Sequence, residues 1–113
     1  MSWPSVTPRL VANGAEQLVA FVKRVFNARG DYQTSRPTEL WIGESVLLIS
    51  EVDVRGPQTA FLYVYVADAD ATFRAAVDAG ARAIDEPWDT PYGDRRGMVE
   101  DAWGNTWQIA TAR

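Results

Sequence analysis

The spacing of apolar residues along the chain predicts two amphipathic helices. In residues 15–28, an apolar stripe runs from Leu18 to Val25 with the three- and four-residue spacing of a helix face. In residues 69–79, a shorter stripe of the same kind begins at Phe73. Both stretches have the length of an ordinary globular helix, so each is expected to pack one face against a core.

Residues typical of helix caps lie at the ends of both stretches. Asn13 or Gly14 can start the first helix, and Gly30 lies where a helix often ends in the left-handed conformation. Asp68 is a good N-cap for the second helix, which Gly80 closes. The two helices therefore have defined limits.

Strand-like runs surround each helix in the same order. Residues 6–12 precede the first helix and residues 60–66 precede the second. Three shorter runs follow each helix: residues 29–33, 38–42 and 43–50 in the first half, and residues 81–84, 96–101 and 104–111 in the second. The order strand, helix, three strands thus occurs twice, which indicates a duplicated unit.

The two copies can be superposed on their caps and hairpin glycines. This alignment places Val6 on Phe61 and Leu47 on Gln108, with a short insertion in the Pro- and Gly-rich residues 86–97 of the second copy. We interpret residues 1–113 as a single domain, with module one at about residues 1–56 and module two at about 57–113.

Composition and charge narrow the classes of function. The chain is 47% hydrophobic and carries a formal net charge of -4, which argues against disorder. The pI near 4.7 and the lack of clustered Lys and Arg argue against nucleic-acid binding. No apolar run approaches the roughly 20 residues that cross a bilayer. No signal peptide is readable, so we expect no membrane partner and a cytoplasmic location.

Three local strings point to a family. Residues 63–70 form a strand that runs into an Asp-capped helix, and residues 79–81 close that helix. Residues 100–107 are similar to an Asp-Pro-x-Gly-Asn hairpin in which Ala102 replaces the usual proline. Residues 86–95 are similar to the longer loop of some glyoxalase-like proteins. In this order, the strings resemble the vicinal oxygen chelate superfamily of glyoxalases, bleomycin-resistance proteins and extradiol dioxygenases.

The resemblance implies an α+β fold in which two βαβββ modules form a curved mixed sheet with a concave cup and helices outside. Members of the family are usually homodimers, and some exchange their first strand. Pro4 and Pro8 flank that strand here and fit either an exchange or an ordinary edge strand. Trp3 belongs either to a dimer contact or to a loose terminus.

Enzymes of this family hold one divalent metal ion with an inward side chain from the first and last strand of each module. The resemblance assigns these positions to Val6 or Thr7, Leu47, Phe61 and Gln108. Gln108 alone has a suitable ligand atom, and the chain contains no His and no Cys. Its acidic clusters lack the spacing of a calcium loop. We therefore expect no metal and no other cofactor.

Strand alternation then predicts what lines the cup, although a shift of one residue would reverse every assignment. The expected wall is apolar and aromatic with a few polar points, as in a small-molecule site. Aromatic side chains near hairpin glycines or in the inserted loop are candidates for its edge and mouth. The predicted ligand-binding residues are Leu47, Ile49, Glu51, Phe61, Tyr63, Tyr65 and Gln108, with Trp41, Trp88 and Trp103 around them.

These features favour a metal-independent binding protein of the bleomycin-resistance type, which sequesters an aromatic or planar antibiotic or secondary metabolite. The acidic pI favours a cationic or neutral ligand. One alternative is a metal-free glyoxalase-like isomerase or lyase that uses Glu51, with a raised pKa, or a tyrosine as acid or base. Another is a structural dimer whose cup is filled by its own side chains.

Two neighbouring arginines follow the predicted loop. Arg95 and Arg96 fit either contact with an anionic group or surface ion pairs with Glu100 and Asp101, and we expect the surface pairs.

Overall fold

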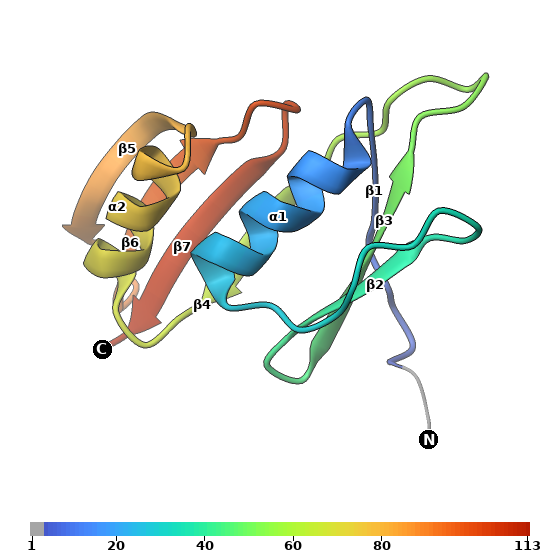
Figure 1. The fold of residues 1–113 in the computed structure, drawn as a ribbon. Coiled ribbons are helices and arrows are strands. Elements are labelled where there is room, and N and C mark those ends of the chain that lie inside the picture. The colour runs from blue at the N-terminus through green and yellow to red at the C-terminus, as the bar shows by residue number, and fades with distance from the viewer. Residues whose placement is uncertain (1–3) are drawn as a thin grey trace. The chain divides into compact units, whose positions relative to one another are not determined.

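The computed structural model describes residues 4–113, so Trp3 lies outside the described part of the chain. It contains two compact units, Met1–Ala60 (unit 1) and Phe61–Arg113 (unit 2), which are described separately below. Their elements, drawn in Figure 1, are β1 (Arg9–Ala12), α1 (Ala15–Phe26), β2 (Thr38–Ile42), β3 (Ser45–Glu51), β4 (Phe61–Tyr65), α2 (Ala69–Asp78), β5 (Arg82–Asp89), β6 (Asp94–Glu100) and β7 (Thr106–Ala112).

Unit 1 contains α1 and a three-stranded sheet of order β1-β3-β2, in which β1 is parallel and β2 antiparallel to β3. The predicted strand at residues 29–33 does not form. Of these five residues, Arg29 alone forms an isolated β-bridge, and its partner is Trp41. The backbone turns at Gly30, whose φ of 138° lies outside the range that other residues readily adopt.

Unit 2 contains α2 and a four-stranded sheet of order β4-β7-β6-β5, in which β4 is parallel to β7 and the other pairs are antiparallel. The predicted loop at residues 86–95 is shorter than expected: β5 continues to Asp89 and β6 begins at Asp94, so only residues 90–93 connect the two strands. Pro87 is accommodated because β5 is an edge strand whose register with β6 shifts between Asp85 and Trp88.

Both helices pack against the sheet of their own unit. Apolar side chains from the helix stripes and from alternate strand positions are buried, including Leu18 and Val22 of α1 and Trp107 and Ile109 of β7. The predicted α+β class is confirmed. Within residues 4–113, no helix is both long and apolar enough to span a membrane.

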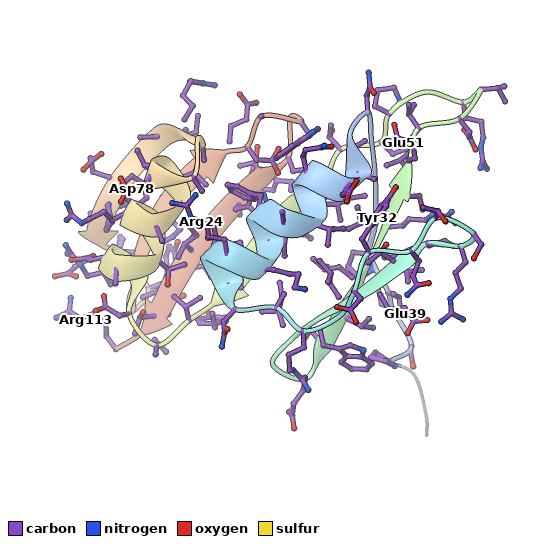
Figure 2. All side chains as sticks on the ribbon, viewed as in Figure 1. Arg24, Tyr32, Glu39, Glu51, Asp78 and Arg113 are labelled. Atoms are coloured by element: carbon purple, nitrogen blue, oxygen red, sulfur yellow. The ribbon has the colours of Figure 1, made fainter. Side chains whose placement is uncertain are left out.

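The last strand of each unit bonds the first turn of the helix in that unit. Glu51 of β3 accepts a hydrogen bond of 2.9 Å from the backbone N–H of Ala15, and Figure 2 shows Glu51 beside the start of α1. Thr111 of β7 accepts one of 2.8 Å from the backbone N–H of Ala69 in α2. Glu51 and Thr111 are therefore equivalent, and their side chains lie on the helix-covered face of each sheet.

Candidate ligand site on the second sheet

The two faces of the unit 2 sheet differ in what covers them. On one face, Gly97 lies against the ring of Phe73 in α2, and Arg95 forms an ion pair with Asp70 of the same helix. Because side chains alternate along a strand, the neighbours of these residues project from the other face. We call this second face the polar face; it carries Tyr63, Tyr65, Asp94, Arg96 and Gln108.

Asp94 joins two tyrosines on the polar face. Its Oδ2 accepts hydrogen bonds from the hydroxyl of Tyr63 at 2.7 Å and from that of Tyr65 at 2.9 Å. Its own backbone is held by Thr90, whose hydroxyl donates to the Asp94 carbonyl at 2.7 Å and accepts from the Asp94 N–H at 3.1 Å. The turn between β5 and β6 thus positions a buried carboxylate under two phenol groups.

This arrangement raises the pKa of both phenol groups. For Tyr63 the main cause is burial of the hydroxyl, followed by its hydrogen bond to Asp94. For Tyr65 the hydrogen bond to Asp94 is the main cause of the raised pKa. Both hydroxyls therefore stay protonated at neutral pH and act as hydrogen-bond donors, which disfavours either tyrosine as a general base.

Arg96 is the buried cation of the polar face. Its Nη1 donates to Oε1 of Gln108 and its Nη2 donates to Oδ2 of Asp85, both at 3.3 Å. Its Nε is buried and has no hydrogen-bond partner among residues 4–113. Leaving a buried donor unpaired costs about 1–3 kcal/mol and more when the group is charged, so this N–H requires an explanation.

Exposed aromatic side chains accompany this polar cluster. Phe61 of β4 is 68% exposed. Trp88 of β5, directly opposite Arg96 in the sheet, is 46% exposed. The rings of Tyr63 and Tyr65 lie 5.3 Å apart, centroid to centroid, and are tilted by 54°. The polar face therefore combines flat apolar surface with fixed hydrogen-bonding groups, the usual composition of a small-molecule site.

The structure reverses the expected orientation of β3 in unit 1. Leu47 and Ile49, predicted to line the cup, are 6% and 1% exposed and share a sheet face with Glu51. Leu48 and Ser50 project from the other face instead. The prediction was one residue out of register because it matched Gly43 with Gly104, although the first turn has only residues 43–44 and the second has 101–105.

The proposed catalytic role of Glu51 fails because its side chain lies on the helix-covered face of the sheet and bonds the start of α1. Hydrogen bonds from the backbone N–H groups of Ala15 and Gly14 lower the pKa of its carboxyl group, whereas a general base in an apolar wall needed a raised pKa. Gly14, the N-cap of α1, has no side chain to bond these N–H groups, and Glu51 replaces it. Glu51 therefore has a structural role at a helix N-terminus.

Trp41 is a residue of unit 1, and Trp103 is a residue of the turn between β6 and β7 in unit 2. Trp41 belongs to β2 and lines a surface pocket of unit 1 of about 230 Å³. Trp103 lies in the turn before β7, where its backbone N–H donates to Oδ1 of Asp101 at 2.9 Å. Asp101 also accepts from Asn105 and from the indole of Trp107, so this family-like hairpin is a structural feature.

The family's metal positions do not fit a metal ion in this chain. The corrected register makes Leu48, not Leu47, the counterpart of Gln108, and neither leucine has a ligand atom. Phe61 has none, and the Gln108 amide oxygen accepts from the guanidinium of Arg96. No group of three or more acidic, His or Cys side chains able to hold a metal occurs in the part of the chain that the structure describes.

Arg96, Asp94 and Asp85 were not recognised as site residues in the sequence. Arg95 pairs with Asp70 and Asp89, and Arg96 with Asp85, so the expected surface pairs with Glu100 and Asp101 are wrong. The available signal was alternation along Asp94-Arg95-Arg96, but the predicted strand begins at residue 96 and leaves Asp94 in the loop, whereas β6 begins at Asp94.

A comparison with protein-family models matches residues 6–109 to the glyoxalase/bleomycin resistance protein/dioxygenase superfamily. The chain belongs to this superfamily. Among curated proteins, it is 27% identical to an uncharacterized protein of Mycobacterium bovis, with 94% of this chain and 82% of that protein covered.

Solved structures show the same fold. TioX from Micromonospora sp. ML1 is 22% identical with a TM-score of 0.81, and all of both chains is covered. The fosfomycin resistance protein FosX from Mesorhizobium loti is 17% identical with a TM-score of 0.73, covering 100% of this chain and 94% of that one. At these identities the likeness establishes the fold alone, so the ligand has to be inferred from the residues of this chain.

Proposed function

We propose that this protein binds an aromatic or planar small molecule on the polar face of unit 2 without using a transition metal. The observation that carries the proposal is the pairing of exposed rings, Phe61 and Trp88, with a fixed hydrogen-bonding cluster on the same sheet face. Exposed apolar side chains beside ordered polar groups are typical of a binding surface.

Stacking on these rings supplies affinity for a flat ligand. An aromatic pair contributes about 0.5–1.5 kcal/mol beyond the burial of area, and two such rings are available. The hydroxyls of Tyr63 and Tyr65 both donate hydrogen bonds to Asp94, so these three side chains are ordered before a ligand arrives. Preorganisation of this kind lowers the entropic cost of binding.

The chemistry of the metal positions supports a metal-independent mode. A guanidinium donates to the Gln108 oxygen that would have to bind the ion, and a cation in that place opposes a second cation. The protein is therefore proposed to act by sequestering its ligand, as an antibiotic-resistance protein would, and by analogy with its family to do so as a cytoplasmic homodimer.

Titration calorimetry of EDTA-treated protein with phenazine, bleomycin and 2-naphthamide tests this proposal. We expect micromolar binding of at least one compound, equal in EDTA-treated and untreated protein, and about a tenfold loss in Trp88→Ala. Val77→Ala is the matched control because it truncates an exposed apolar residue of α2 in the same unit. Absence of binding to all three compounds, or binding that disappears with EDTA, would contradict the proposal.

A further inference from the structure

Arg96 presents an incomplete set of hydrogen bonds on the polar face. We infer that the ligand carries a neutral carbonyl-type oxygen, as in an aryl amide, ketone or quinone, which accepts a hydrogen bond from Nε of Arg96. This inference rests on the proposed function, since it names the ligand class for the same face.

The first step of the argument is the unpaired donor. The Arg96 side chain is 10% exposed, and among residues 4–113 its Nε has no partner. Buried polar groups in native proteins are almost always bonded to protein, water or ligand. A guanidinium nitrogen can only donate, so the missing partner is an acceptor atom.

The second step is the charge around that donor. Asp85 lies 3.3 Å from Nη2 of Arg96. Asp94 lies two residues earlier on the same strand and face, about 7 Å away along the strand. One carboxylate therefore contacts the guanidinium, and a second lies on the same face two residues away. An anionic ligand group would be repelled by this pair, and a cationic group could not accept the hydrogen bond, which leaves a neutral oxygen.

The third step is geometry. Trp88 is the direct partner of Arg96 across the β5–β6 ladder, so the two side chains project from the same face as cross-strand neighbours, and the indole is half-exposed. A planar ligand that stacks on this indole brings an oxygen at its edge to Arg96. Because Nε is covered, the guanidinium must turn to reach that oxygen. Its bonds to Gln108 and Asp85, both 3.3 Å, lengthen in turning, so the bond to the ligand oxygen must offset their loss.

The test uses a charge series on one ring system with EDTA-treated protein. Calorimetry compares 2-naphthamide, 2-naphthoate, 2-naphthylmethylammonium and 2-methylnaphthalene. We expect 2-naphthamide to bind about tenfold more tightly than each of the others. In Arg96→Met this preference should disappear. Arg95→Met removes the same charge from the neighbouring residue on the helix-covered face and should keep it.

A second measurement does not depend on the Arg96 variant folding. In the unmodified protein, addition of 2-naphthamide should shift the ¹H–¹⁵N signal of the Arg96 Nε–H, which is assigned through its correlations with the Arg96 side-chain and backbone atoms. Binding of 2-naphthamide without that shift would overturn the inference.

The remaining outcomes separate the two proposals. Equal binding of all four compounds, with loss in Trp88→Ala, would keep the binding site and overturn the neutral acceptor. Tighter binding of 2-naphthoate would overturn it in favour of an anion. Failure of every compound, together with phenazine and bleomycin, would remove the proposed function itself.

Discussion

Glu51 and Thr111 perform the same task in the two units of this chain. Each is a side chain of the last strand, and each accepts a hydrogen bond from the first residue of the helix in its unit, at 2.9 Å from Ala15 and 2.8 Å from Ala69. This equivalence fixes the register of the internal repeat. The two hydrogen bonds differ in one respect: α2 also has a side-chain cap in Asp68, whereas the N-cap of α1 has none.

Glu51→Gln is therefore expected to destabilise the protein at neutral pH. The pKa of Glu51 is lowered in the folded state, so its contribution is present above the unfolded pKa of about 4.3 and is lost as the pH falls through the folded value. Urea unfolding should show a lower midpoint for Glu51→Gln at pH 7, and the difference should shrink progressively as the pH falls below the unfolded pKa of about 4.3. Glu44→Gln, which changes an exposed turn residue, is the control. Equal midpoints at pH 7 would contradict the capping role.

Asp94→Asn is expected to lower the pKa of Tyr65 more than that of Tyr63. The hydrogen bond to Asp94 is the main cause of the raised pKa in Tyr65, whereas burial is the main cause in Tyr63. Absorbance at 295 nm during an alkaline titration measures phenolate formation, and Tyr63→Phe and Tyr65→Phe assign the two signals.

The sign of the associated pH dependence follows from the raised pKa values. Stability from the two protonated phenols is fully present below the unfolded pKa of about 10 and is lost as the pH rises through the folded values. The unmodified protein should therefore lose more stability than Tyr65→Phe does as the pH rises above about 10. An identical alkaline loss in both proteins would show that Tyr65 contributes nothing through its titration.

Gly30→Ala is expected to cost about 3 kcal/mol or more of stability, because backbone strain and a steric clash act together. A Cβ at this position would collide with the carbonyl oxygen of Glu39 and lie 3.1 Å from Cδ2 of Leu40. Gly43→Ala is the matched control, since Gly43 also has a positive φ but has no atom near its Cβ position. We expect about 1 kcal/mol there. Equal losses in denaturant unfolding would show that the clash is relieved by movement of the neighbouring chain.

The fold was predictable because its signals are local and repeated. The helix stripes and the Asp68 cap lie within a few residues of the contacts they make, and Asp68 does accept from Ala71 as expected. The outward face of Phe61, Tyr63 and Tyr65 followed from alternation alone, because this short strand has no bulge.

The rest of the site depended on contacts that sequence spacing does not reveal. Pro87 and Gly93 are typical of a loop, so Asp94 was assigned to that loop and its place beside Arg96 on the polar face was not predicted. In unit 1, turns of different length shifted the apparent register by one residue and placed Leu47 on the wrong face. The assignment of Glu51 to a helix N-terminus requires knowing that Ala15 is near it in space.

Asp101→Ala is expected to destabilise unit 2 by about 3 kcal/mol or more, because one buried side chain satisfies several donors. Its Oδ1 accepts from the backbone N–H groups of Trp103 and Asn105, both at 2.9 Å. Its Oδ2 accepts from the indole Nε1 of Trp107 at 2.8 Å. Removing the carboxylate leaves these donors without that acceptor. The turn that they hold connects β6 to β7, the two inner strands of the sheet. Thermal unfolding followed by tryptophan fluorescence measures the loss.

Two further variants separate this explanation from a general effect of removing an acidic residue. Asp78→Ala removes a carboxylate from the exposed end of α2 and should change stability by less than about 0.5 kcal/mol. Trp107→Phe keeps a ring in the core but removes the indole N–H, so Asp101→Ala should cost less in that background than in the unmodified protein. If the two losses are simply additive, the bond between Asp101 and Trp107 is not the source of the stability, and the backbone bonds of the turn account for it instead.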